Sequence, residues 1–385
     1  MKQWLIDHAI VVLCYLFRVF RVNNKKIVIT SYLGRGYGDN PKYIVEKLLA
    51  SGIEYDIVWL VKGKGHVFPS GIRIVDYQSL KAIYELCTAK VWIDNRRKPP
   101  YIRKRKTQCY IMTWHGFMAI KKIEKDAEDS LEPRYIKMAK NDSKMIDYFV
   151  AGSRWESATI SDSFWYDGAI LECGYPRCDI LLKNNRDACY RIKKDYGLSE
   201  QDRILLYAPT FRQAKDEKSL SVYKLDWDKT LETMKSVFGG NWIGMIRLHP
   251  NVAGLADLLR IPKHVIDATT YDDMQELITA CDCMITDYSS SIMDAGVARK
   301  LGFIFATDYE EYAKDRDVYF DIKEDLPFPF AESNDQLIDN LISFDKNKYY
   351  TELERFLKYT YGVYDEGNAS SKICELIEKV TRGSR

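Results

Sequence analysis

The hydrophobic and polar positions of the chain follow a repeating order. Short runs rich in β-branched and aromatic residues end abruptly in polar or charged residues. Stretches with apolar residues at helical spacing separate these runs, as in NPKYIVEKLLASG at 40–52, where a glycine follows the last apolar turn. Strands that alternate with helices in this way indicate parallel sheets with crossover helices. The runs predict strands at 26–32, 55–61, 90–95, 109–115, 147–153, 169–175, 203–210, 242–250, 264–269, 283–291 and 301–306.

A polar stretch at 182–203 divides this series in two. A chain of 385 residues exceeds the size at which one hydrophobic core keeps growing, so two domains are expected. We place the boundary near Lys183, between α/β domains at 25–183 and 184–385, and the last helix could cross back to the first domain. Each would be a doubly wound, Rossmann-like domain, which binds ligands at the carboxyl ends of its strands. Two such domains facing each other would form a cleft.

Residues 1–24 form a third segment. Nine uncharged residues from Ala9 to Phe17 are bracketed by charged or polar ones. This core is shorter than the roughly 20 apolar residues that a membrane-spanning helix needs, and no small-residue cleavage site of a signal peptide follows it. We expect an amphipathic helix that lies on the membrane with its arginines at the headgroups. The alternative is a helix packed on its own domain.

Composition narrows the class of protein. The hydrophobic fraction is 46% and the charged fraction 29%, which is typical of a globular protein and excludes a disordered one. The net charge of +2 gives no reason to expect a nucleic-acid partner, although the basic clusters at 18–26 and 96–106 could meet phosphate or an anionic membrane. The nine cysteines are scattered without a Cys-x-x-Cys pair, so we expect reduced thiols and no structural zinc site.

Groups suited to anions follow three predicted strands of the second half. Serines after the strand that ends at Thr286 precede a helix, whose free N–H groups and dipole would favour a phosphate. The alternative is that these serines only cap the helix. Asp294 could accept a hydrogen bond from a ribose or another hydroxyl. The candidate anion-binding and hydroxyl-binding residues are Thr210, Arg212, Arg247, Ser289, Ser290, Ser291 and Asp294. His249 is a candidate catalytic residue, with a hydrogen-bonded structural histidine as the alternative.

The strand at 109–115 ends in tryptophan, histidine and glycine. An imidazole titrates near neutral pH, so His115 could take a proton from an attacking hydroxyl. Gly116 would let backbone or substrate approach closely. Lys121 and Lys122 could hold phosphate charge nearby, or they could belong to a solvated helix face.

Four motifs, WHGFMAIKKIEKD, YAPTFR, RLHP and TDYSSSIMD, occur in this order, with DNPKYIVEKL and GYPRCDIL as further landmarks. In these motifs the chain resembles the CDP-glycerol glycerophosphotransferase family, the teichoic acid primases and polymerases, from about Ile27 to Tyr361. The resemblance implies a GT-B type architecture, peripheral attachment to the inner face of the cell membrane, and phosphotransfer from a CDP-alditol. The implied site consists of His115 as base, His249 on the donor's pyrophosphate, Ser289, Ser290 and Asp294 on the donor, and Gly116, Lys121, Lys122 and Asp126 on the acceptor side or on phosphate.

Departures from the family pattern concern the acceptor side. Phe117 and Met118 stand where family members usually carry a small hydroxyl residue and a proline, and Cys178 replaces the usual asparagine before Asp179. The length favours a primase or a single-step enzyme over a long-chain polymerase. Asp287 and Asp294 leave room for a magnesium ion that accompanies the donor, and no other cofactor is expected.

The predicted reaction moves an alditol phosphate, most simply glycerol phosphate, from a CDP-alditol to a polyprenyl-diphosphate-linked sugar in the synthesis of teichoic acid or a related polymer. CMP is the leaving group. A homo-oligomer is compatible with the sequence. One alternative is a GT-B glycosyltransferase, which would release a nucleoside diphosphate from a sugar nucleotide; the other is a non-catalytic membrane scaffold.

Overall fold

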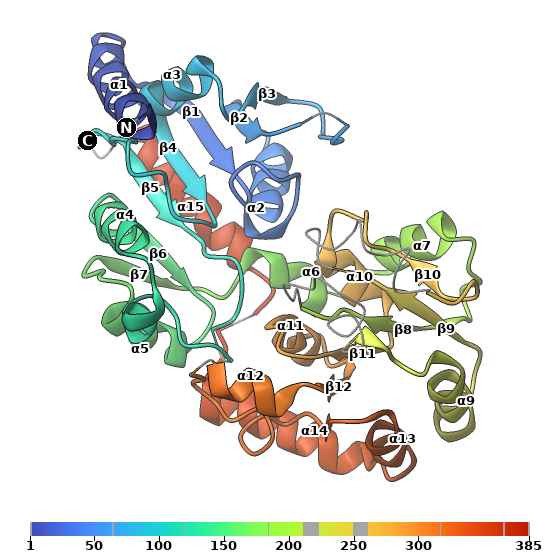
Figure 1. Ribbon diagram of the computed structural model, residues 1–385. Coiled ribbons are helices and arrows are strands. Elements are labelled where there is room, and N and C mark those ends of the chain that lie inside the picture. Colours follow the sequence, from blue (N-terminus) through green and yellow to red (C-terminus); the bar gives the residue numbers. More distant parts are fainter. Residues whose placement is uncertain are drawn as a thin grey trace. The chain divides into compact units, whose positions relative to one another are not determined.

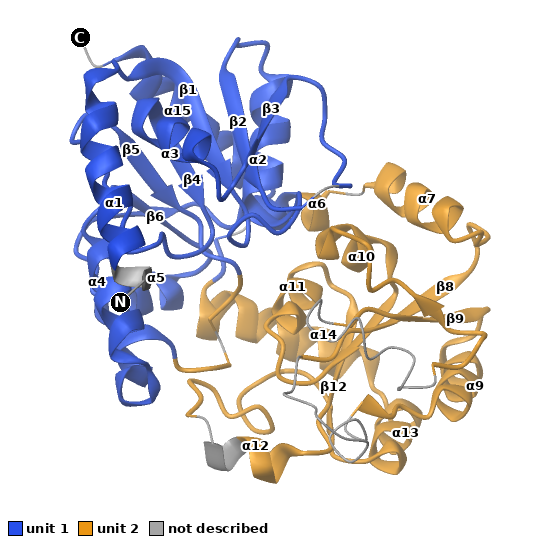
Figure 2. Cartoon of the chain, turned by 45° about the horizontal axis from the view of Figure 1, so that its top comes forward, with its two compact units in different colours: residues 1–115, 123–179, 363–385 blue, residues 116–122, 180–362 orange. Residues whose placement is uncertain are grey.

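The computed structural model describes residues 2–63, 65–118, 120–183, 185–210, 223–248, 261–315, 317–364 and 366–383. The chain divides into two compact units (Figure 2). Unit 1 comprises residues 1–115, 123–179 and 363–385, and unit 2 comprises residues 116–122 and 180–362. Each unit is built on one parallel sheet, so the predicted α/β fold with parallel sheets is confirmed.

The sheet of unit 1 has seven parallel strands in the order β3-β2-β1-β4-β5-β6-β7 (Figure 1). Ile27 of β1 pairs with Ile57 of β2 on one side and with Val91 of β4 on the other. The order of the strands reverses between β1 and β4, and ligands of doubly wound sheets bind beyond the carboxyl ends at such a point. The strands are β1 (Asn23–Thr30), β2 (Asp56–Val61), β3 (Ile72–Asp76), β4 (Ala89–Asp94), β5 (Cys109–Met112), β6 (Tyr148–Ala151) and β7 (Ala169–Glu172).

Helices cover the sheet of unit 1. The last helix of the chain, α15, packs against α2, β1 and β4 and therefore belongs to this unit. Its first two backbone N–H groups donate to the carboxylate of Asp179, at 2.9 Å each. The helices are α1 (Lys2–Leu16), η1 (Phe17–Val19), α2 (Asp39–Ala50), α3 (Leu80–Thr88), η2 (Glu124–Ser130), α4 (Pro133–Ser143), α5 (Arg154–Ser163), η3 (Pro176–Cys178) and α15 (Ala369–Arg382).

The sheet of unit 2 has the parallel order β10-β9-β8-β11-β12-β13, which reverses between β8 and β11. Its strands are β8 (Arg203–Tyr207), β9 (Trp242–Ile246), β10 (Ile266–Asp267), β11 (Cys283–Thr286), β12 (Leu301–Phe305) and β13 (Phe330–Ala331). The helices of unit 2 begin with α6, whose first residue, Asp179, is still assigned to unit 1. They are α6 (Asp179–Leu182), α7 (Arg186–Asp195), α9 (Trp227–Phe238), α10 (Met274–Ala280), α11 (Ser291–Val297), α12 (Tyr309–Asp315), α13 (Asn334–Ile342), α14 (Lys346–Arg355) and η6 (Phe356–Tyr361).

The segment 116–122 is part of unit 2 although both of its flanks belong to unit 1. The Met118 N–H donates to the Tyr361 hydroxyl at 3.0 Å, and the Phe117 ring lies 6.0 Å from the Tyr361 ring. Lys121 pairs with Val318 in an isolated antiparallel bridge. Phe117 and Met118 are both buried, so they help to anchor the segment in unit 2.

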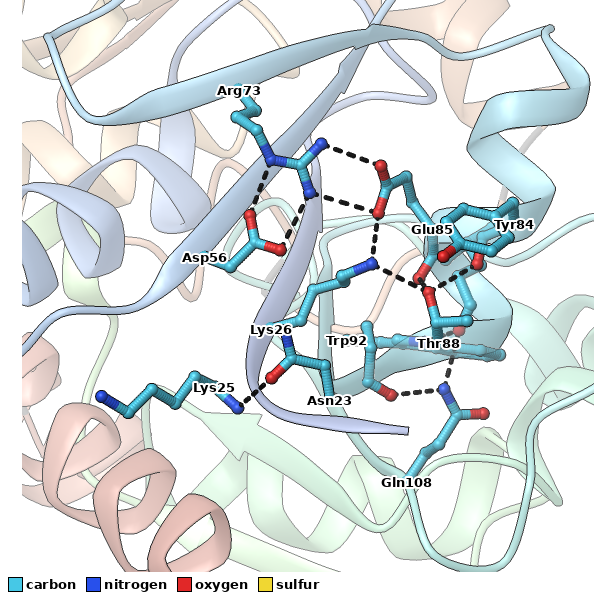
Figure 3. Close-up of polar contacts among 12 residues, drawn as sticks. Asn23, Lys25, Lys26, Asp56, Arg73, Tyr84, Glu85, Thr88, Trp92 and Gln108 are labelled. Atoms are coloured by element: carbon cyan, nitrogen blue, oxygen red, sulfur yellow. Dashed lines mark hydrogen bonds and ion pairs between the residues drawn. The ribbon is translucent and has the colours of Figure 1, made fainter. Parts of the chain in front are cut away.

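A charge network joins the amino-terminal side of the unit 1 sheet to α3 (Figure 3). The buried Lys26 donates to Glu85 at 2.6 Å and to the Thr88 hydroxyl at 2.9 Å. Arg73 of β3 donates to Glu85 at 2.8 Å and binds both carboxylate oxygens of Asp56 in β2. Because a buried charge is costly unless it is paired, these contacts define where α3 sits on the sheet.

The helix α1 packs on its own unit along one side. Ile10, Cys14 and Phe17 contact Ile83 and Cys87 of α3. This is the packed alternative left open by the sequence, but it leaves the other side of the helix apolar and exposed. The exposed apolar side chains are Leu5, Ile6, Val12, Tyr15 and Leu16 in α1, and Val19 and Phe20 after it. Among the residues described, no helix combines the length and the apolar character needed to cross a membrane.

Candidate functional site

A polar group lies where β1 and β4 end, at the point where the strand order of unit 1 reverses. Asn95, directly after β4, accepts the Tyr32 N–H on its side-chain oxygen at 2.7 Å. Its side-chain nitrogen donates to the Ser31 hydroxyl at 3.3 Å and to the Asp39 carboxylate at 3.0 Å. One buried side chain thus joins the ends of two adjacent strands and the start of α2.

His115 is bound to the same turn. Its Nδ1 lies 2.9 Å from the main-chain oxygen of Asn95. A carbonyl oxygen only accepts, so Nδ1 carries the proton and Nε2 of the neutral ring is left as the acceptor. The Trp114 and Tyr32 rings lie 4.4 and 6.0 Å from the imidazole. The arrangement presents one basic nitrogen in a defined orientation.

The surroundings keep this imidazole neutral. Burial, then the charge of Arg96 and more weakly that of Arg177, hold the pKa of His115 well below its usual range, against the effect of the Asn95 carbonyl. Burial and neighbouring cations both favour the neutral form of a histidine. At neutral pH His115 is therefore a proton acceptor, as a general base must be.

Backbone strain is concentrated in this group. Tyr32, Asp39 and Trp114 have φ angles of 45°, 58° and 54°, in the left-handed region that side chains other than glycine rarely adopt. Asn40 holds the strained tryptophan, because its side-chain nitrogen donates to the carbonyls of Thr113 and Trp114 at 3.2 and 3.1 Å. Such strain persists only where the surroundings impose it, and it clusters at functional sites.

A second group lies where β8 and β11 end, at the point where the strand order of unit 2 reverses. The Thr210 N–H and hydroxyl donate to the two carboxylate oxygens of Asp287 at 2.8 and 3.0 Å. The Tyr288 N–H donates to the same carboxylate at 2.7 Å. These bonds use most of the acceptor capacity of Asp287, which leaves little for a magnesium ion.

The serines after β11 do not cap α11 through the N-cap side chain. Ser290 is the N-cap residue, and its hydroxyl makes no capping hydrogen bond. Instead, the Ser289 hydroxyl oxygen accepts the Ser291 hydroxyl at 2.8 Å and the Ser291 N–H at 3.3 Å. With seven residues, α11 has a weak dipole, so the hydroxyl groups are the better candidates for contact with an anion.

Gly116 and Ser290 come together within unit 2. A β-carbon on Gly116 would lie 2.8 Å from the Ser290 hydroxyl oxygen, closer than real contacts of this kind. The residue after His115 therefore has to be a glycine if the serine turn is to keep its place. The sequence assigned Gly116 to close approach, and the partner that approaches is this turn.

The remaining candidates are placed as follows. The Arg247 guanidinium donates to the main-chain oxygens of Tyr271, at 3.1 and 3.3 Å, and Asp272, at 3.3 Å. Lys121 lies over the Tyr312 ring at 5.5 Å, and Lys122 pairs with Asp317 at 3.2 Å, both in unit 2. Asp126 belongs to unit 1, where it accepts a hydrogen bond from Ser163. Asp294 is buried in α11, and Arg212 and His249 lie outside the described residues.

Comparison with known proteins identifies the family. The model of the CDP-Glycerol:Poly(glycerophosphate) glycerophosphotransferase family matches residues 12–379. The chain belongs to this family. It is therefore a member of a family of transferases, as the resemblance in the motifs implied.

Two relatives and one solved structure show the extent of the similarity. The chain is 31% identical over 371 residues to the teichoic acid poly(glycerol phosphate) polymerase of Staphylococcus epidermidis, covering 93% of this chain and 51% of the relative. It is 29% identical over 391 residues to the teichoic acid glycerol-phosphate transferase of Staphylococcus aureus, covering 97% and 98%. A variant of the wall teichoic acid polymerase TagF soaked with CDPG has a TM-score of 0.83 at 28% identity, covering 97% of this chain and 94% of that one.

The chain thus spans about half of the first relative and nearly all of the second. Its match to the family includes every described residue of the two polar groups. Sequence reasoning missed several members of the unit 1 group, although a signal was present. The pair Asp-Asn ends a strand-like run at 94–95 and begins a helix at 39–40, and polar residues at such ends are the same signal that pointed to His115. The missed residues are Tyr32, Asp39, Asn40, Asn95, Arg96 and Arg177.

Proposed function

We propose that this member of the glycerophosphotransferase family transfers glycerol phosphate from CDP-glycerol to the hydroxyl of a lipid-linked saccharide in teichoic acid synthesis. The observation that carries the proposal is the neutral His115, whose Nδ1 donates to Asn95 and whose Nε2 is left to accept a proton. The family, the relatives described as acting on glycerol phosphate, and the likeness to a structure soaked with CDPG support the choice of donor.

In the proposed step, Nε2 of His115 takes the proton of the acceptor hydroxyl while the oxygen of that hydroxyl attacks the β-phosphorus of the donor. The new bond joins the acceptor oxygen to that phosphorus, and the bond from the β-phosphorus to the bridging oxygen breaks. CMP leaves with the electron pair of that bond. Positioning and charge stabilisation contribute most of the acceleration in phosphoryl transfer, so the groups that hold the diphosphate matter as much as the base.

We assign the donor to unit 2. Thr210, Ser289, Ser290 and Ser291 offer hydroxyl groups where β8 and β11 end, and Asp294 would accept from a ribose or glycerol hydroxyl. Arg212, Arg247 and His249 would supply positive charge to the diphosphate. The hydrogen bonds from the Arg247 guanidinium to the main-chain oxygens of residues 271 and 272 would orient its charge toward the diphosphate.

We further propose a GT-B type architecture with the domain boundary near Lys183 and the last helix crossing back to the first domain, in which His115 acts on a donor held by unit 2. Gly116, Lys121, Lys122 and Asp126 would serve the acceptor or its phosphate. The exposed apolar side of α1, next to Arg18 and Arg21, supports attachment to the inner face of the cell membrane, where a polyprenyl-linked acceptor lies. We assign the enzyme to primase-like, single-step addition. The chain matches a glycerol-phosphate transferase and a poly(glycerol phosphate) polymerase along nearly their whole lengths, so the length of the product is what tests this assignment.

The test is nucleotide release from CDP-glycerol, CDP-ribitol and a UDP-sugar, with a short-chain lipid-linked disaccharide as acceptor. We expect CMP from CDP-glycerol, and a product that carries few glycerol phosphates by mass spectrometry. His115→Ala should lower the rate of CMP release by about 10²–10⁴-fold, because a general base contributes this much.

The matched control is His264→Ala, which removes an exposed histidine that pairs with Asp228 in unit 2. It should release CMP at the wild-type rate. Release of UDP in place of CMP would identify a glycosyltransferase, and a His115→Ala protein that turns over like wild type would remove this residue from the mechanism. A long polymer as product would contradict the primase assignment.

A further inference from the structure

Two of the nine cysteines lie in contact at the junction of α1 and α3. All nine are free thiols. Cys14 of α1 and Cys87 of α3 form one buried apolar cluster with Ile83, and they are 1% and 2% exposed. The Cys87 thiol donates to the main-chain oxygen of Cys14 at 3.7 Å, and the Cys14 thiol donates to the main-chain oxygen of Tyr101 at 3.9 Å. Residues distant in sequence thus place two thiols side by side on two packed helices.

The surroundings favour one of these thiols as the nucleophile. The hydrogen bond from Cys87 has the largest effect on the pKa of Cys14 and, with Arg103 and Arg18, lowers it to about 7 against the opposing effect of burial. The same contact and burial raise the pKa of Cys87. A thiolate is the reactive form in exchange with disulfides, so Cys14 would react first and Cys87 would resolve the intermediate.

Contacts along one side hold α1, which carries Cys14, and the residues after it on unit 1. Asp7 pairs with Arg134 at 3.4 Å, the Cys14 thiol donates to the main-chain oxygen of Tyr101 at 3.9 Å, and Arg18 donates to that of Lys104 at 3.4 Å. Besides the apolar cluster, Arg105 donates to the main-chain oxygens of Phe17 and Phe20 at 2.7 and 2.8 Å. The Phe17 and Phe20 rings contact Tyr84 edge-on, at 5.8 and 5.2 Å. The opposite side of α1 is exposed and α1 contributes no strand to the sheet, so local opening of this helix would uncover Cys14 while the sheet stays paired.

We propose that Cys14 and Cys87 are a dithiol modification site, which a low-molecular-weight disulfide oxidises to a bond that joins α1 to α3. The Cys14 thiolate attacks one sulfur of the small disulfide, forming a mixed disulfide and releasing one small thiolate. Cys87 then loses its proton to that thiolate, and its sulfur attacks the Cys14 sulfur and displaces the second small thiolate. The protein loses two electrons and two protons, and the small disulfide becomes two thiols.

The bond would fasten α1 covalently to a part of unit 1 that is itself fixed by the Lys26–Glu85–Arg73 network. A disulfide restricts the open states of the segment it closes, so oxidation should hold α1 down. This inference is independent of the proposed transferase activity, because it concerns the attachment of a helix and uses no residue of the site.

The experiment treats the folded, reduced chain with oxidised glutathione, blocks the remaining thiols and digests with trypsin without reduction. We expect the peptides 3–18 and 82–90 to appear as one linked species that separates on reduction. Amide hydrogen exchange of α1 in the oxidised protein should slow by about tenfold or more. Cys14→Ser and Cys87→Ser should each abolish both effects.

The matched controls are Cys109→Ser and Cys374→Ser, which remove cysteines elsewhere in unit 1 and should leave the linked peptide unchanged. The proposal is overturned if folded wild-type protein yields no such peptide, or yields it only after urea is added. A linked peptide together with unchanged hydrogen exchange in α1 would show that the disulfide does not hold α1 on α3, and would also overturn the proposal. The wild-type peptide map decides even if a serine variant fails to fold.

Discussion

At the scale of single residues, the charge state of His115 depends on side chains that need not touch the substrate. Arg96 is exposed, follows Asn95 directly and lowers the pKa of the imidazole through its charge. Removing that charge makes the protonated ring less unfavourable, so the pKa should rise. Because only the neutral ring accepts a proton, activity should then be lost at a higher pH than in wild type.

We therefore expect Arg96→Gln to shift the acidic limb of the kcat/KM profile upward, by up to about one pH unit. In wild type this limb should lie below the ordinary range of histidine, so activity should be flat through neutral pH. The measurement is CMP release at a series of pH values. Arg134→Gln, which removes an exposed arginine from α4, should leave the profile unchanged; coincident profiles for all three proteins would exclude Arg96 as the cause.

At the scale of elements, the position of α3 depends on Glu85. Burial is the largest effect on this carboxyl and opposes ionisation, but hydrogen bonds from Arg73 and Lys26 bring its pKa below the ordinary value. A lowered pKa stabilises the fold above the pKa of the unfolded state, and that contribution is lost as the pH falls through the folded-state pKa. Removal of the Glu85 carboxylate would leave the buried Lys26 without its ion-pair partner.

We expect Glu85→Ala to lower the free energy of unfolding at neutral pH by about 3–5 kcal/mol, as breaking a buried ion pair does. The difference from wild type should shrink as the pH falls from about 4.5, the ordinary pKa of a glutamate, through the lower pKa that Glu85 has in the folded state, where the wild-type carboxylate also becomes protonated. Urea unfolding measures both effects. Glu354→Ala breaks an exposed pair with Arg299 and should cost less than about 1 kcal/mol; equal losses would show that burial of the network is unimportant.

The exposed apolar side of α1 makes a prediction about binding to membranes. Val12 and Leu16 are 56% and 60% exposed and lie one turn apart. If this side enters the membrane interface, Leu16→Glu should weaken binding to phosphatidylglycerol vesicles by about tenfold or more, and added salt should weaken wild-type binding. Sedimentation with vesicles measures this. Ile342→Glu, at a similarly exposed apolar position in unit 2, is the control, and vesicle binding that survives Leu16→Glu would argue against α1 as the attachment.

At the scale of the whole molecule, the division into units assigns His115 to unit 1 and the serine turn at 289–291 to unit 2. His115 belongs to unit 1 and Gly116 to unit 2, so the chain passes from one unit to the other at that peptide bond. The described residues of the polar group in unit 2 nevertheless all follow strands of unit 2 itself. It should therefore bind the donor before any acceptor is present.

We expect CDP-glycerol alone to slow hydrogen exchange at Thr210 and in the segment 287–291 of unit 2. At a hundredfold excess over Kd, binding should raise the free energy of unfolding by about 2.7 kcal/mol. Mass-spectrometric exchange and thermal unfolding measure the two effects, with UDP-glucose as the control nucleotide. Protection confined to unit 1 would contradict the assignment of the donor to unit 2.

The sequence by itself determined most of the strands, the parallel sheets and the side chains that follow strand ends, but it missed β3 and β13. A run such as RILLY is a local property, and parallel strands bring their carboxyl ends to one edge, so Thr210 and Asp287 could be expected to meet. The predicted strands at 109–115 and 283–291 extend beyond β5 and β11 because their last residues form the polar groups. β3 escaped detection because it is an edge strand whose arginine and aspartate are exposed.

Only the tertiary structure decided what these side chains contact. The partner of His115 is a main-chain oxygen of Asn95, and main-chain atoms leave no signal in a sequence. The packing of Phe117 and Met118 against Tyr361 places the segment 116–122 in unit 2, and Cys14 meets Cys87 only because α1 packs on α3. Periodicity reports which face of an element is apolar, whereas the identity of the group that covers that face depends on contacts between residues far apart in the chain.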